Sequence, residues 1–242
     1  MDVNAHVPIR GIIFDKDGTL FDFGTTWEAW AAGFLVRICG QDLDRARRVG
    51  AAIGFDLDQR RFDRTSVVIA GTPEDIADAL QSQFPDMARA ELLSILNDEA
   101  TLAPQAEAVP LLPFLTALRA RDLRLGVATN DAEAPARAHL EAAHVVPCFD
   151  FIAGSDSGYG GKPDPGQLLG FCEATGLVPE TVVMVGDSLH DLRAGQAAGM
   201  RRIAVLTGLA EASELAPYAS VVLPDIGHIP GWIDMQVGVR PT

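Results

Sequence analysis

The feature that most constrains the fold is an alternation of short apolar runs with helix-length amphipathic stretches from residue 109 onward. The amphipathic stretches cover residues 109–121, 133–143, 165–175 and 189–198. The apolar runs are too short for helices, and we expect strands at 9–14, 123–128, 149–153, 181–185, 202–206 and 220–223. Single helices between strands predict right-handed crossovers and a mostly parallel sheet, whose ligands gather at the carboxyl ends of the strands.

Residues 21–103 differ from this pattern, because they carry several helical patterns and only a brief β-branched patch at 66–70. Thr72, followed by proline and two acidic residues, is a typical N-cap for one of these helices. We therefore predict an α/β fold in which a helical cap is inserted into a three-layer, Rossmann-like core. The predicted domains are a core of residues 1–20 and 104–242 and a cap of residues 21–103.

The charge of the chain limits its partners. Lys and Arg number 19 against 33 Asp and Glu, which gives a formal net charge of -14. Such a chain repels nucleic acid and anionic membranes, so neither is expected as a partner. An anionic substrate would need a bound cation and a well-placed Lys or Arg. No stretch approaches 18 uninterrupted apolar residues, and the three cysteines show no short repeated spacing, so we expect a cytoplasmic protein.

Two acidic clusters follow predicted strands. Asp15 and Asp17 come after the first strand, and Asp187 and Asp191 come after the strand predicted at 181–185. Both clusters can converge at the carboxyl edge of one sheet although they are far apart in the sequence. Mg²⁺ prefers a few carboxylates together with waters and phosphate oxygens, so this pairing favours a magnesium site. Two acidic turns are the simpler alternative, because Asp and Gly are common in turns.

Three further residues could bind an anion. Thr129 and Asn130 end a predicted strand with a hydroxyl and an amide, which can donate hydrogen bonds to a phosphoryl oxygen. The same two residues would also suit the start of a helix. Lys162, after two glycines, is the cation that the charge argument requires, although a solvated loop lysine is the alternative.

In order and spacing, these segments resemble the four motifs of the haloacid dehalogenase superfamily of aspartate-nucleophile hydrolases. The matching segments are residues 14–20, Thr129 with Asn130, Lys162, and 186–188 with Asp191. The insertion resembles the helical cap of the phosphoglycolate phosphatase and β-phosphoglucomutase branch. The chain departs from the usual pattern at Lys16, where an apolar residue is common.

The resemblance implies a Mg²⁺-dependent phosphatase that acts on a small phosphorylated metabolite such as phosphoglycolate. Asp15 would attack phosphorus to form an aspartyl-phosphate, and Asp17 would serve first as acid and then as base. In this superfamily an aspartate at the position of Asp17 marks phosphoryl transfer, which argues against dehalogenation. The metal would be held by the side chains of Asp15 and Asp187 and by the backbone carbonyl of Asp17.

The remaining motif residues would hold the phosphoryl group or support the residues that do. The resemblance assigns phosphate binding to Thr129, Asn130 and Lys162, and Asp191 would orient Lys162 or a metal-bound water. Arg61 is a candidate from the cap, because a guanidinium would suit the carboxylate of a small phospho-acid. A sugar-phosphate phosphomutase and a catalytically silent binding protein of the same fold stay open as alternatives, as do a monomer and a homodimer.

Overall fold

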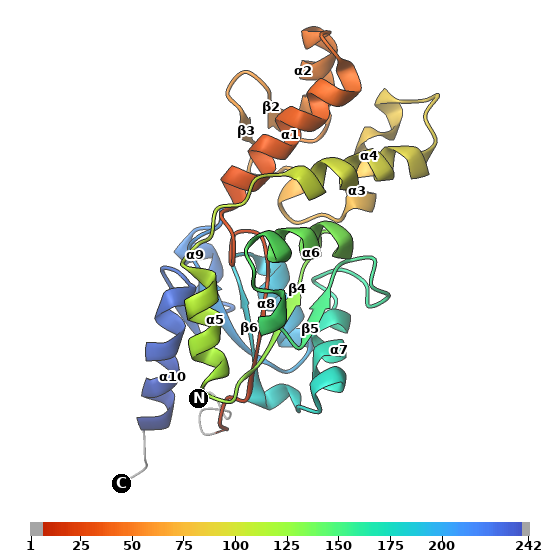
Figure 1. Ribbon diagram of the computed structural model, residues 1–242. Coiled ribbons are helices and arrows are strands. Elements are labelled where there is room, and N and C mark those ends of the chain that lie inside the picture. Colours follow the sequence, from red (N-terminus) through yellow and green to blue (C-terminus); the bar gives the residue numbers. More distant parts are fainter. Residues whose placement is uncertain (1–6, 239–242) are drawn as a thin grey trace.

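The computed structural model describes residues 7–238 and contains a six-stranded sheet flanked by helices, with further helices at one end of the molecule (Figure 1). The strand order is β5-β4-β1-β6-β7-β8, and every neighbouring pair is parallel. The strands are β1 (Gly11–Phe14), β4 (Arg124–Ala128), β5 (Phe151–Ala153), β6 (Val182–Gly186), β7 (Arg201–Val205) and β8 (Val221–Leu223). The predicted parallel sheet is confirmed, with each strand within two residues of its expected position.

Helices cover both faces of this sheet, so the core has three layers. Clusters of buried side chains place α5, α6 and α10 on one face and α7 and α8 on the other. The core helices are α5 (Leu111–Arg119), α6 (Glu133–Ala142), α7 (Gly166–Thr175), α8 (Leu189–Ala197), α9 (Ala212–Leu215) and α10 (Ile229–Gly238). Short 3-10 turns connect them at Val146–Cys148, Pro179–Thr181 and Ile226–His228.

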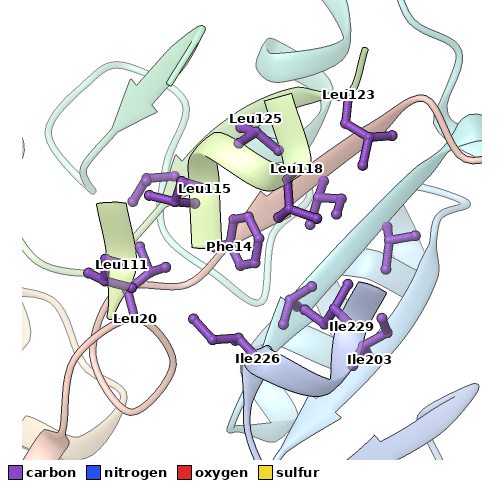
Figure 2. Packing of buried hydrophobic residues seen from close by; sticks show 14 of the residues in the cluster. Phe14, Leu20, Leu111, Leu115, Leu118, Leu123, Leu125, Ile203, Ile226 and Ile229 are labelled. Atoms are coloured by element: carbon purple, nitrogen blue, oxygen red, sulfur yellow. The ribbon is translucent and has the colours of Figure 1, made fainter. Parts of the chain in front are cut away.

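The central strand shows why the sequence folds this way. Side chains of successive strand residues point to opposite faces, so Ile12 and Phe14 pack on one side of β1 and Ile13 packs on the other. Figure 2 shows Phe14 between Leu115 and Leu118 of α5. These side chains are fully buried, and each contributes on the order of 2 kcal/mol through the hydrophobic effect.

The helices beyond the carboxyl edge of the sheet form the cap and bury a hydrophobic cluster of their own. Thr72 is an N-cap as predicted, and its hydroxyl accepts a hydrogen bond from the backbone N–H of Asp75. The members of this cluster lie between Phe23 and Ala103, and the domain bounds at residues 21 and 103 stay a prediction. The cap consists of α1 (Phe23–Cys39), α2 (Leu43–Ala52), β2 (Phe55–Asp56), β3 (Arg61–Phe62), α3 (Pro73–Leu80), α4 (Arg89–Leu102) and 3-10 turns at Val67–Ile69 and Gln81–Gln83.

Polar contacts hold the cap against the core. The side-chain nitrogen of Asn130 donates to the carbonyl of Ala70 at 2.7 Å, and Arg64 reaches two glutamates of the core, Glu211 and Glu214, at 3.1 and 3.2 Å. Between residues 7 and 238, no helix is long and apolar enough to span a lipid bilayer.

Candidate active site

Four motif residues meet where β1, β4 and β6 end. Each of these strands is followed directly by one of them: β1 by Asp15, β4 by Thr129 and β6 by Asp187. The fourth, Lys162, lies in the loop between β5 and α7. All four are at least nine-tenths buried and line one cavity between core and cap. β1 lies at the point where the strand order reverses, which is the usual position for a ligand in such a sheet.

Lys162 joins two of the aspartates. Its Nζ donates to Oδ1 of Asp15 at 2.6 Å and to Oδ1 of Asp191 at 2.7 Å. Burial opposes the charge of this lysine, but the two carboxylates outweigh it and raise the pKa of Lys162 above its usual value. A charged ammonium therefore faces the nucleophile candidate at the floor of the cavity.

The backbone around Lys162 is fixed by the side chain of Asn130. The Asn130 Oδ1 accepts from the backbone N–H of Lys162 at 2.7 Å, and its Nδ2 donates to the Lys162 carbonyl at 2.9 Å. The Asn130 side chain is thus occupied, which leaves its backbone N–H as the group suited to an anion. The Thr129 hydroxyl accepts from the N–H of Asp131 at 3.1 Å and keeps its own proton to donate.

Asp191 is held by the start of α8. Its Oδ2 accepts from the N–H and the hydroxyl of Ser188 at 3.0 and 2.6 Å, and the Ser188 hydroxyl in turn accepts from the Asp191 N–H. This reciprocal pairing is a capping box, which arises from a serine three residues before an acidic residue. The capping box at the start of α8 therefore orients the other carboxylate oxygen of Asp191, Oδ1, toward Lys162.

Asp187 completes an acidic group that could hold a cation. Ligand oxygens of Asp15, Asp187 and Asp191 all lie within 4.8 Å of one another, and the three residues are buried. The backbone approaches Asp187 closely, because a Cβ on Gly208 would fall 1.6 Å from its Oδ2 and one on Gly18 would fall 2.5 Å away. These glycines leave room for the carboxylate and for a ligand beside it.

The electrostatics of this group favour a divalent cation. Burial raises the pKa of Asp15 to about 7, with Lys162 opposing and Asp191 and Asp17 adding to the rise. Burial also raises the pKa of Asp187 well above its usual value. Three carboxylates face one lysine, and their hard oxygen donors suit Mg²⁺, which would neutralise the excess negative charge. The residues present fit the metal that the sequence predicted.

Lys16 forms a second buried network beside the first. The side chain of Lys16 is fully buried, and its Nζ donates to Oδ1 of Asp17 at 2.8 Å and lies 3.2 Å from Oδ2 of Asp131. The same Nζ lies 2.9 Å from Nδ1 of His139, on α6. The lysine therefore directs its positive charge toward the carboxylate predicted to act as acid and base.

His139 connects this network to the cap. Its Nε2 lies 2.7 Å from the carbonyl oxygen of Ala100 in α4. A carbonyl can only accept, so the ring proton is assigned to Nε2, and Nδ1 is left to accept from Lys16. Burial and the nearby charge of Lys16 lower the pKa of His139 to about 4, which keeps the ring neutral.

In the sequence, Lys16 stands out only as a departure from the family pattern, and no sequence feature marks Asp131 or His139 as part of the site. A lysine at the end of a buried strand was a usable signal, since a buried ammonium needs acidic partners. The hypothesis for Arg61 was wrong. Arg61 lies on β3 in a separate hollow of the cap and is not among the described residues that line the active-site cavity.

A family model and several known proteins are similar to this chain in sequence. A family model described as haloacid dehalogenase-like hydrolase matches residues 9–199. A phosphoglycolate phosphatase from Nitrosospira multiformis is 31% identical over 210 residues, which cover 86% of this chain and 88% of that protein. A phosphoglycolate phosphatase from Escherichia coli is 29% identical over 221 residues, with 85% and 84% of the two chains covered.

Two solved structures show the same fold at lower identity. CbbY from Rhodobacter sphaeroides, in complex with phosphate, has a TM-score of 0.64 at 24% identity and covers 91% of this chain and 96% of its own. An L-2-haloacid dehalogenase from Xanthobacter autotrophicus has a TM-score of 0.61 at 18% identity, with 96% and 100% covered. The family model spans most of the chain, and the fold agrees with it. The chain belongs to the haloacid dehalogenase-like hydrolase family and is therefore an enzyme of the hydrolase class.

Proposed function

We propose that this hydrolase is a magnesium-dependent phosphatase that cleaves a small phosphomonoester through an aspartyl-phosphate on Asp15. The contact of Asp15 with Lys162, beside Asp17 and Asp187 in one buried cavity, is the observation that carries the proposal. Relatives named as phosphatases support it. Because the fold is also that of a dehalogenase, the choice of reaction depends on the residues of the site rather than on the fold.

In the first step, a carboxylate oxygen of Asp15 attacks phosphorus, and the bond from phosphorus to the leaving oxygen breaks. Lys162 holds Oδ1 of Asp15 and neutralises negative charge on the phosphoryl oxygens. The Thr129 hydroxyl and the backbone N–H of Asn130 would bind the same oxygens.

Asp17 would move the protons of both steps. As an acid it protonates the leaving alkoxide, and as a carboxylate it then takes a proton from the water that attacks the aspartyl-phosphate. Lys16 holds one carboxylate oxygen of Asp17 by a hydrogen bond, so the other oxygen can carry the proton. This pairing fixes the orientation of the acid relative to Asp15.

Magnesium would be held by the side chains of Asp15 and Asp187 and the backbone carbonyl of Asp17, and when bound it supplies positive charge to the phosphate. Asp191 would keep Lys162 in place. Phosphoglycolate is one candidate substrate, because relatives carry that name. The four motifs hold only the phosphate, so they suit other small phosphorylated metabolites equally. A cytoplasmic location stays a prediction.

Release of inorganic phosphate from a panel of phosphomonoesters, with and without Mg²⁺, tests the proposal. We expect release that needs Mg²⁺ and disappears in Asp15→Asn, a variant that keeps the shape of the side chain but loses the nucleophile. Transfer of the phosphate to a second hydroxyl of the substrate would instead show a phosphomutase. If the folded, magnesium-loaded protein hydrolyses none of the esters, the result would favour a catalytically silent binding protein.

A further inference from the structure

The cap supplies an apolar wall to the active-site cavity. Helices α1, α3 and α4 and the 3-10 turn at Val67–Ile69 bring aromatic and aliphatic side chains to the side opposite Asp15. Leaving groups bound by the phosphatase proposed above would contact this wall. Its main members are Phe23, Trp27, Trp30, Ile69, Ile76 and Leu96.

The floor of the cavity carries an excess of negative charge. Among the lining residues of the described chain, Lys162 is the single Lys or Arg, and Asp15 and Asp191 already occupy it. His190 also lines the cavity, next to Asp191 in the chain. A bound magnesium ion would offset part of this negative charge, but the phosphate of the substrate would add to it, so no Lys or Arg of the lining would remain for a second anionic group.

The arginines of the cap do not supply a cation for a second anionic group of the substrate. Arg47 pairs with Asp44 and Asp58 on the outer surface, and Arg64 pairs with two glutamates at the start of α9. Neither lines the cavity, and Arg61 lies in the separate hollow described above. A carboxylate on the substrate would therefore enter an apolar wall without a charged partner, and burying an unpaired carboxylate is costly.

We propose that the substrate is a phosphomonoester whose leaving alcohol is uncharged and largely apolar, of aromatic or branched aliphatic type. The inference rests on the proposed phosphatase function and selects the substrate class for that same site. Aromatic rings of the wall can stack on a planar alcohol.

A pair of esters that differ only in charge tests this. Benzyl phosphate and para-carboxybenzyl phosphate share the same leaving atom, and phosphoglycolate is added as a small acidic ester. We expect kcat/KM for benzyl phosphate to exceed that for either acid by about tenfold or more. An equal or higher value for an acid overturns the inference while the phosphatase stands. No hydrolysis of any ester overturns the phosphatase itself, and the inference with it.

A charge placed in the wall provides a second test. Ile69→Arg puts a guanidinium at a half-buried lining position, and we expect it to shift the ratio of kcat/KM toward para-carboxybenzyl phosphate by about tenfold. Val67→Arg is the matched control, since Val67 is half-buried on the same turn but does not line the cavity. An equal shift in both variants, or in neither, contradicts the proposed wall. If Ile69→Arg fails to fold, the wild-type ratio of the ester pair still decides.

Discussion

Nζ of Lys16 lies 2.9 Å from Nδ1 of His139, and this contact links the loop that carries the nucleophile to the cap through Ala100. The two residues are 123 positions apart in the chain. A neutral imidazole accepts from a charged ammonium on one side and donates to a backbone carbonyl on the other. Asp17 accepts a hydrogen bond from the same Lys16 ammonium. The position of Asp17 is therefore coupled to the packing of α4 against α6.

Replacement of Lys16 by methionine should lower kcat by about tenfold or more with a smaller change in KM, because Asp17 loses the donor that orients it. The fold should also lose roughly 3 kcal/mol, since the buried Asp131 and the half-buried Asp17 would be left without their cation. Steady-state kinetics and urea unfolding measure the two effects. In the double variant with Asp131→Asn, stability should recover while kcat stays low; recovery of kcat as well would show that Lys16 acts only on stability.

His139→Gln should change how stability depends on pH. Glutamine can donate to Ala100 and accept from Lys16 but does not titrate. The pKa of His139 is lowered from 6.5 to about 4 by burial and by Lys16, so the unfolded chain takes up the proton first as pH falls. Stability from this residue is present above pH 6.5 and is lost toward pH 4, by up to roughly 3 kcal/mol.

Other groups titrate alike in both proteins, so the difference between wild type and His139→Gln isolates the histidine. Chemical denaturation at a series of pH values should show the wild type losing stability relative to the variant between pH 6.5 and 4. A difference that does not vary with pH would mean that folding does not lower the pKa of His139.

Asp17→Asn should slow both chemical steps, since an amide neither protonates the leaving group nor takes a proton from water. General acid–base catalysis contributes about 10²–10⁴-fold, and we expect kcat to fall by a factor in that range. Slow hydrolysis of the intermediate should let the aspartyl-phosphate accumulate as a phosphate adduct in the intact mass. Asp15→Asn, which lacks the nucleophile, is the control and should show none. Full activity of Asp17→Asn would remove its proposed role.

Most of the core fold was predictable from local pattern. Strand positions follow from apolar runs such as 181–185, and the N-cap at Thr72 follows from its neighbours, because both depend on residues close in sequence. The convergence of Asp15 with Asp187 was also predictable, since parallel strands bring their carboxyl ends to one edge. Roles in catalysis for these residues stay predictions until they are tested.

The Lys16 network and the wall of the cavity were not predictable in the same way. His139 meets Lys16 only because α6 packs beside α4, and no local signal in the sequence marks that pairing. The same reason explains the error at Arg61, because the orientation of the short β2–β3 hairpin depends on how the cap packs. Contacts between distant elements depend on tertiary packing, which periodicity does not describe.

Magnesium should stabilise the folded protein more at pH 8 than at pH 6. The pKa of Asp15 is raised to about 7 and that of Asp187 is also raised, so protons compete with the cation at the lower pH. At a concentration 100 times its Kd, a ligand that binds only the folded state adds about 2.7 kcal/mol. Thermal unfolding with and without Mg²⁺ at both pH values measures the effect, with Asp187→Asn as the variant in which it should shrink. An equal rise in Tm at both pH values, or an undiminished rise in Asp187→Asn, would place the cation away from these carboxylates.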